Sequence, residues 1–296
     1  MMKKHCMRYV APRFYDLWTT CHMHGWRHLA PFKWDETRKA LTYACLVDGE
    51  AVDVVATQNK RSVTVTLVSH HGLTSRTMRH LTAMIRRSLG LDVDTAPLLA
   101  VARRAGPAYG PLIRQGAGRL LRSPTLWEDA AKTLFTTNCS WALTERMCAA
   151  ACAQMLSLPT PLGQYPFPSP ARIAALSPAR LRVVLPVGYR APALRALAAA
   201  FARDPLLGGL EDGAFDSTTA LATLRALDGF GPYAAAHLLL LANHCDEIPV
   251  DSVVVSYVRQ HFRARHLQTF LSRRYRAWRP FRWWGYKLER IRRQQG

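Results

Sequence analysis

Acidic residues are the scarcer charged class in this chain of 296 residues. It has 20 Asp and Glu against 40 Lys and Arg, so its formal net charge is +20 at pH 7 and its isoelectric point is near 10.3. A field of one sign attracts polyanions and speeds their encounter with the protein, although it does not identify the polyanion. The composition therefore predicts a polyanionic partner.

Long apolar runs are also missing. No segment reaches the roughly 18 consecutive apolar residues that mark a membrane span, and the first residues, MMKKHCMRYVAPRFYDLW, lack the apolar stretch of a secretion signal. We therefore expect no membrane span, no secretion and a cytoplasmic location.

The cysteines do not form a disulfide framework. There are seven, an odd number at irregular spacings, and none follows Cys245, which favours reduced thiols. A short run rich in metal-binding side chains is present near the N-terminus, but its spacing matches no standard zinc pattern; its members are Cys21, His22, His24 and His28. We expect no bound metal.

The end of the chain concentrates the positive charge. Residues 259–296 contain twelve Arg or Lys and a single acid, Glu289. Such basic side chains can contact phosphates, and the interleaved aromatic residues can either stack on bases or pack inward; these are Tyr275, Trp278, Phe281, Trp283, Trp284 and Tyr286. A membrane-surface helix fits poorly, because Trp and Arg are mixed without a clean apolar stripe.

The pattern of the chain predicts an α+β fold. Segments 39–47, 51–58 and 62–69 are rich in β-branched and aromatic residues, and Asp48-Gly49 between the first two is a hairpin signal. A helix over 74–89 follows. The first 95 residues or so are therefore expected to form an antiparallel sheet crossed by one helix. Beyond it the pattern is mainly helical, with helices expected over 96–105, 124–135, 142–156, 169–175, 178–185, 191–203, 218–227, 232–241 and 252–262. Segments 159–170 and 208–215 are expected to be loops.

A glycine hairpin is the first motif with chemistry. Gly229-Phe230-Gly231-Pro232 separates two expected helices, and its glycines permit close backbone approaches that a side chain would block. Pro232 suits a first helical position, so the amides from Phe230 to Tyr233 would lie at a helix N-terminus, where anions bind readily. Taken alone, the hairpin is equally an ordinary tight turn.

A lone carboxylate follows at the distance of one helix and one loop. It is Asp251, in Ile248-Pro249-Val250-Asp251, immediately before the helix expected over 252–262. Asp is a favoured helix cap, and a capping carboxylate is also one that is held rigidly. The hairpin and the carboxylate together are far more specific than either alone.

The combination LDGFGPYAAAHLLLL with IPVDSVVV resembles the helix-hairpin-helix, Gly/Pro-Asp superfamily of DNA base-excision glycosylases. Two further segments support the resemblance, SPTLWE followed by LFTTNCSW at 123–141, and Val187-Gly188-Tyr189-Arg190-Ala191, which is similar to a segment of the 8-oxoguanine branch. The resemblance covers roughly residues 95–260 in the right order. It implies three parts: a β-rich N-terminal subdomain (1–95), a helical glycosylase core (96–262) and a basic aromatic extension that packs on it (263–296).

The resemblance implies a role for each motif residue. Asp251 would be catalytic, stabilising the positive charge that builds on the sugar as the base leaves and positioning a water. Gly229, Phe230, Gly231 and Tyr233 would form the phosphate-binding hairpin, where the family can also bind a monovalent cation. Members that also nick the strand have a lysine where this chain has Tyr233, and a tyrosine cannot form their Schiff base. Arg225 and His237 lie nearby without matching that place, so we expect base removal without strand cleavage.

Base flipping needs a wedge and a pocket. Asn138 matches the family's wedging asparagine, Tyr189 its intercalating residue and Arg190 its contact to the orphaned base, which would be cytosine; the plain alternative for Tyr189 and Arg190 is a surface turn. Tyr233 and Trp141 are pocket candidates, although Tyr233 can equally pack the first helical turn. Trp127, Trp283 and Trp284 are further stacking candidates, each of which can equally belong to the core.

The sequence leaves open which base is removed and whether the protein is an enzyme. The segment at 187–191 favours 8-oxoguanine-like lesions, the missing lysine favours the monofunctional alkylpurine branch, and a hypermodified base of foreign DNA is a third alternative. The competing class is a DNA-binding protein that uses the hairpin only as a clamp. The resemblance implies duplex DNA with a modified base as partner, a monomer, association with the nucleoid if the source is bacterial, and no iron–sulfur cluster, because no cysteine follows Cys245.

Overall fold

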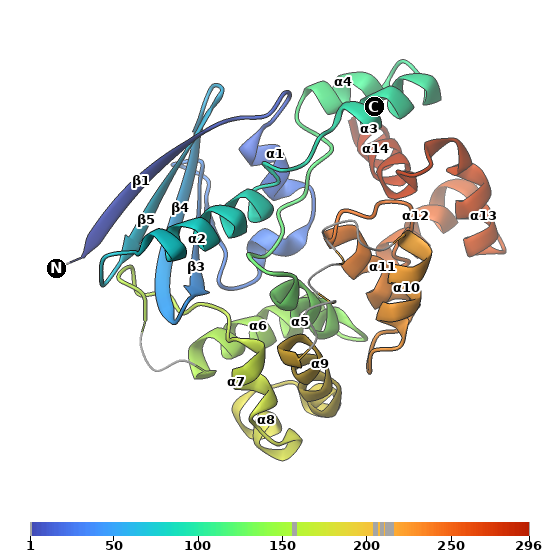
Figure 1. The fold of residues 1–296 in the computed structure, drawn as a ribbon. Coiled ribbons are helices and arrows are strands. Elements are labelled where there is room, and N and C mark those ends of the chain that lie inside the picture. The colour runs from blue at the N-terminus through green and yellow to red at the C-terminus, as the bar shows by residue number, and fades with distance from the viewer. Residues whose placement is uncertain (1, 156–158, 204–206, 208–209, 211–215, 296) are drawn as a thin grey trace.

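The protein has an α+β architecture in which a sheet on one side is followed by a helical body (Figure 1). The computed structural model describes residues 2–155, 159–203, 207, 210 and 216–295. The fold class expected from the sequence is confirmed.

The sheet has five antiparallel strands in the order β1-β5-β4-β3-β2. Their bounds are β1 Lys3–Val10, β2 Lys33–Asp35, β3 Ala40–Val47, β4 Glu50–Asn59 and β5 Ser62–Ser69. The three predicted strands are present, and Asp48 and Gly49 have the positive φ angles, 48° and 85°, of the expected turn. The two edge strands were not predicted, because β1 is largely polar and β2 is very short, as is common at sheet edges.

Three helical elements connect the sheet to the rest of the molecule. α1 (Leu17–His22) and the 3-10 turn η1 (Gly25–His28) lie between β1 and β2, and were not predicted. α2 (Ser75–Ser88) crosses the sheet, as expected, and Thr74 caps it by accepting a hydrogen bond from the amide of Thr77 (Figure 1).

The helical body agrees with the predicted helices to within two residues at most ends. Its elements are α3 Ala96–Ala105, α4 Tyr109–Arg114, α5 Leu126–Thr136, α6 Trp141–Met155, α7 Pro170–Ala174, α8 Pro178–Val184, η2 Gly188–Arg190, α9 Ala191–Arg203, α10 Ser217–Arg225, α11 Pro232–Leu241, α12 Ser252–Phe262, α13 Leu267–Arg274, η4 Arg276–Trp278 and α14 Arg282–Gln295. Most of the loop expected over 208–215 lies outside the described residues. Among the helices described, none is both long and apolar enough to cross a bilayer.

Two apolar cores hold the molecule together. One runs from the sheet through α5, α9 and α11 without interruption, and the other joins α3 and α4 to α12, α13 and α14. The C-terminal aromatic residues left open by the sequence pack inward, since Tyr275, Trp278, Trp283, Trp284 and Tyr286 are all buried.

A buried carboxylate ties the sheet region to the helical body. Asp129 on α5 accepts hydrogen bonds from the indole of Trp26 at 2.6 Å, from the guanidinium of Arg87 at 2.8 Å and from the amide of Ser123 at 2.9 Å. Burial by itself would raise the pKa of Asp129, but Arg87 and these hydrogen bonds outweigh it and hold that pKa below its ordinary value. The ionised carboxylate therefore fixes η1, and with it the segment beside the site, against α5.

Candidate functional site

The two hairpin glycines serve different needs. Gly229 has a φ of +81°, and a Cβ there would lie 2.8 Å from Leu134 and 3.0 Å from Ala193, so the fold itself requires glycine. A Cβ on Gly231 would meet no protein atom within 4 Å, and its φ of −73° is ordinary. The protein's own packing therefore does not require glycine at position 231, and there is room for a ligand beside its backbone.

The hairpin opens α11 with unoccupied backbone donors. Gly231 is the N-cap, Pro232 follows it, and no side chain caps the first turn. Phe230 between the glycines is buried and anchors the turn in the core. The arrangement is that of a helix N-terminus open to an anion such as a phosphate.

A pocket of about 300 Å³ adjoins α11, and four helical parts of the chain and Leu120 of the segment before α5 line it. α11 contributes Tyr233 and His237, and α12 and its cap contribute Asp251 and Val254. The other walls come from the segment of α1 and η1, with His22, His24 and Gly25, and from α14, with Trp283, Tyr286, Lys287 and Arg290. The structure thus places Asp251 and Tyr233, which were predicted separately, in one pocket.

Asp251 is held rigidly on the pocket wall. It is the N-cap of α12, and its Oδ1 accepts a hydrogen bond from the amide of Val254 at 2.8 Å. The second carboxylate oxygen has no protein donor among the described residues. Capping therefore orients the group and leaves it an oxygen for chemistry, so the two interpretations of Asp251 are compatible.

Tyr233 and His237 form a stacked pair on one face of α11. Their rings are 5.5 Å apart at an interplanar angle of 13°, and the hydroxyl of Tyr233 lies 3.4 Å from that of Thr136. Burial lowers the pKa of His237 to about 4, although Asp129 and Asp251 oppose the shift. At neutral pH this wall is therefore aromatic and uncharged.

The N-terminal segment adds a second neutral imidazole. His24 accepts a hydrogen bond from the amide of Trp26 at Nδ1 (3.2 Å) and donates from Nε2 to the carbonyl of Leu121 (2.6 Å), which fixes one neutral tautomer. Burial lowers its pKa to about 3. Next to it, Gly25 packs against the ring of Trp141, since a Cβ on Gly25 would lie 2.6 Å from that ring.

The predicted tryptophans divide between the pocket and the core. Trp283 lines the pocket. Trp141 reaches it only through Gly25, remains 41% exposed and donates to Glu145. Trp127, whose indole donates to the carbonyl of Pro168, and Trp284 are buried away from the lining.

The predicted wedge residues come together at two adjoining turns. Asn138 ends the turn after α5 with a φ of 47°, and Tyr189 in η2 is 64% exposed. Arg190 is buried; its guanidinium donates to the carbonyls of Thr137 and Asn138 and lies 4.6 Å from the ring of Tyr189. Arg190 in this structure joins the two turns, so contact with an orphaned base would require it to leave these carbonyls.

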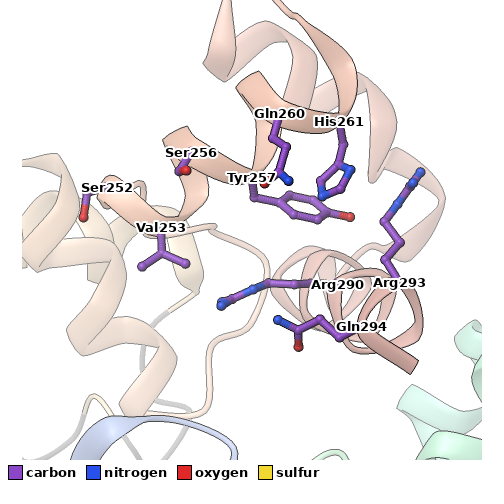
Figure 2. A pocket seen from close by; sticks show the side chains of 9 residues that line it. All are labelled: Ser252, Val253, Ser256, Tyr257, Gln260, His261, Arg290, Arg293 and Gln294. Atoms are coloured by element: carbon purple, nitrogen blue, oxygen red, sulfur yellow. The ribbon is translucent and has the colours of Figure 1, made fainter. Parts of the chain in front are cut away.

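A larger hollow, of about 680 Å³, lies beside the pocket between α12 and α14. Figure 2 shows Tyr257 of α12 over Arg290 and Gln294 of α14, with Ser252, Val253 and Ser256 nearer the start of α12. Arg290 lines both the hollow and the pocket. Several other C-terminal arginines are held in ion pairs: Arg279 and Arg282 with Asp246, and Arg274 and Arg293 with Glu289.

The run of metal-binding side chains near the N-terminus is dispersed. Cys21 is buried, His22 stacks on Trp18 and bonds to Glu36, and His24 faces the pocket. In the described ranges, no three His, Cys, Asp or Glu residues are grouped so that they could hold a metal ion.

Pocket residues that the sequence interpretation did not assign to the site include His237, His24, Lys287 and Arg290. His237 carried a usable signal, because it lies four residues after Tyr233 and therefore on the same helical face. His24 and Lys287 carried none, since only the tertiary fold brings η1 and α14 to the hairpin.

Comparison of the sequence with models of protein families and with curated proteins finds no match to either. Solved structures do match over nearly their whole length. A 3-methyladenine DNA glycosylase from Archaeoglobus fulgidus has a TM-score of 0.72 at 18% identity, covering 95% of this chain and 96% of that one. An 8-oxoguanine glycosylase/lyase from Clostridium acetobutylicum in its apo-form has a TM-score of 0.72 at 13% identity, covering 97% of both chains. The same enzyme in complex with double-stranded DNA containing cytosine opposite 8-oxoguanine has a TM-score of 0.69 at 13% identity, covering 100% of this chain and 99% of that one. The chain therefore has the fold of the helix-hairpin-helix, Gly/Pro-Asp DNA glycosylases.

Proposed function

We propose that this protein is a DNA glycosylase of base-excision repair, which flips a modified base out of duplex DNA and hydrolyses its N-glycosidic bond. The observation that carries the proposal is Asp251, the one carboxylate among the described residues that line a pocket beside the uncapped N-terminus of α11. The solved structures of the same fold are named as glycosylases for two kinds of damaged purine, 3-methyladenine and 8-oxoguanine.

The reaction follows from the placement of these parts. The amides at Gly231 and the first turn of α11 would hold a phosphate of the damaged strand, which brings its sugar toward Asp251. Asn138 and Tyr189 would fill the gap left by the flipped nucleotide. As the base leaves, positive charge develops on the sugar, and the carboxylate of Asp251 stabilises it and orients the attacking water. The product is an abasic site.

The two hairpin glycines give a matched test of the phosphate contact. Gly231→Ala should leave the free energy of unfolding unchanged, since its Cβ enters open space, but should weaken binding of duplex DNA about tenfold, the scale of one lost hydrogen bond to a charged group. Gly229→Ala should instead lower the free energy of unfolding by more than 1 kcal/mol, the scale of strain at a left-handed position with a steric clash. Fluorescence anisotropy and thermal unfolding measure the two effects. Equal DNA affinity of Gly231→Ala and wild type would contradict the phosphate role.

We further propose that the enzyme removes the base without cutting the strand, because Tyr233 stands where strand-nicking members have lysine. Borohydride should then trap no covalent adduct with DNA containing the substrate base or an abasic site. Lys287 is an amine in the same pocket, so the test has a clear opposite outcome. A trapped adduct that disappears in Lys287→Met would show that this lysine supplies the Schiff base and that the protein is a lyase.

A second candidate function, a non-catalytic DNA clamp, is favoured by no specific observation. A clamp would need the hairpin but neither a pocket nor a carboxylate in it. The presence of both is the reason for preferring the enzyme.

A further inference from the structure

We propose that Lys287 makes this pocket selective for neutral purines with an added carbonyl group, and against purines that alkylation has made positively charged. The inference rests on the proposed function, because it takes the pocket beside Asp251 as the place that receives the flipped base. It names the class of lesion, which the sequence left open.

The charges of the pocket lining are unbalanced. Asp251 is its single carboxylate among the described residues and is directed to the sugar in the proposed reaction, whereas Lys287 and Arg290 supply two cationic groups. The imidazoles of His24 and His237 add no charge at neutral pH, because burial lowers the pKa of both well below 6.5. A base in this pocket would therefore face net positive potential on the side of α14.

Lys287 is the cation most closely built into the pocket. It is partly buried and its Nζ lies 6.0 Å from the centre of the Trp283 ring, which is itself buried in the wall. Burial and the neighbouring Arg290 lower its pKa to about 8, while Asp251 acts in the opposite direction. The ammonium is therefore still protonated at pH 7 and only partly screened by water.

Two physical effects discriminate between lesions. A cationic base such as 7-methylguanine would be repelled by the ammonium of Lys287, and the repulsion is stronger where the dielectric constant is low. The ring of Trp283 could attract a cationic base, but the ammonium of Lys287 already lies near that ring. A neutral base with an added carbonyl, such as 8-oxoguanine, offers an acceptor to an ammonium that has three donors and no acceptor. The same side chain thus disfavours one class and favours the other.

The experiment measures single-turnover release of 8-oxoguanine and of 7-methylguanine from otherwise identical duplexes at pH 6.5. Each variant is expressed as the ratio of the two rates relative to wild type, so that the different intrinsic lability of the two glycosidic bonds cancels. Lys287→Met should shift the ratio toward 7-methylguanine by about ten- to a hundredfold, the size expected for removing a like charge from a partly buried site. Lys287→Arg should keep the wild-type ratio within about threefold, because it keeps the charge.

A matched control separates the local charge from the net charge of the protein. Arg292 lies on the same helix but is exposed, with its guanidinium 5.3 Å from the ring of Tyr109 and away from the pocket. Arg292→Gln also removes one positive charge and should leave the ratio unchanged. Thermal unfolding of each variant checks the fold, and Lys287→Gln replaces Lys287→Met if the latter does not fold.

The outcomes distinguish failure of the role of Lys287 from failure of the proposed glycosylase function. An unchanged ratio in Lys287→Met, or the same shift in Arg292→Gln, would overturn the role of Lys287 and leave the glycosylase proposal standing. A wild-type preference for 7-methylguanine that exceeds the ratio of the spontaneous release rates of the two bases would also overturn it. Release of neither base by the wild type would overturn the inference, whereas the proposed function, which covers other modified bases, is overturned by the Asp251→Asn comparison.

Discussion

Asp251→Asn is expected to reduce base release by about three orders of magnitude while duplex binding persists, since a neutral amide cannot stabilise the charge that forms on the sugar. Asparagine is also a good helix cap, so the hydrogen bond from the amide of Val254 should survive and α12 should keep its start. The loss should therefore appear in the rate of abasic-site formation, measured as alkali-labile cleavage, and not in the free energy of unfolding.

The chain offers a second capping aspartate as a control. Asp216 caps α10 by accepting from the amides of Thr218 and Thr219, and it is exposed and does not line the pocket. Asp216→Asn makes the same chemical change at the same kind of position and should retain full activity. Equal base release by wild type and Asp251→Asn would contradict a catalytic role for Asp251 and favour the non-catalytic DNA clamp.

Asp129→Ala is expected to lower the free energy of unfolding by about 3–5 kcal/mol, more than Gly229→Ala or Asp251→Asn. It removes the carboxylate that Trp26, Arg87 and the amide of Ser123 share in a buried setting. Against a total stability of roughly 5–15 kcal/mol such a loss is large, and it should appear as a lower midpoint in denaturant unfolding with an unchanged slope.

An exposed carboxylate provides the comparison. Asp92 pairs with Arg122 at 2.7 Å; the side chain of Asp92 is 43% exposed, that of Arg122 only 6%. Water can partly replace the exposed carboxylate, so Asp92→Ala should cost less than Asp129→Ala, about 1–2 kcal/mol. Similar losses in the two variants would show that Asp129 is not the tie between η1 and α5. Asp129→Ala should also lower activity at temperatures below unfolding, because His24, the N-cap of η1, and Gly25, its first residue, form part of the pocket wall.

The regular elements of the helical body could be predicted because their signals are local. Caps, prolines at first helical positions and apolar periodicity placed α8, α9 and α12 nearly to the residue. The hairpin and Asp251 could be found for the same reason, since Gly229, Gly231 and Pro232 encode their geometry within a few residues.

Contacts across the fold escaped prediction. The sequence around Arg190 contains nothing that shows its guanidinium bound to carbonyls 52 and 53 residues away, which removes it from the surface. The C-terminal aromatics likewise could stack on bases or pack inward, and only their packing against α3 and α4 decides for the core.

The sequence by itself determined the polyanion-attracting charge, the sheet followed by helices, the hairpin, the acid and the tyrosine at the lysine position. The tertiary structure alone decided which side chains surround that acid. His24 and Lys287 lie near opposite ends of the chain and meet in one pocket, because η1 is held by Asp129 and α14 by the second core. Local periodicity reports which face of an element is buried, but the lining of a pocket depends on how distant elements pack, and that packing sets its charge.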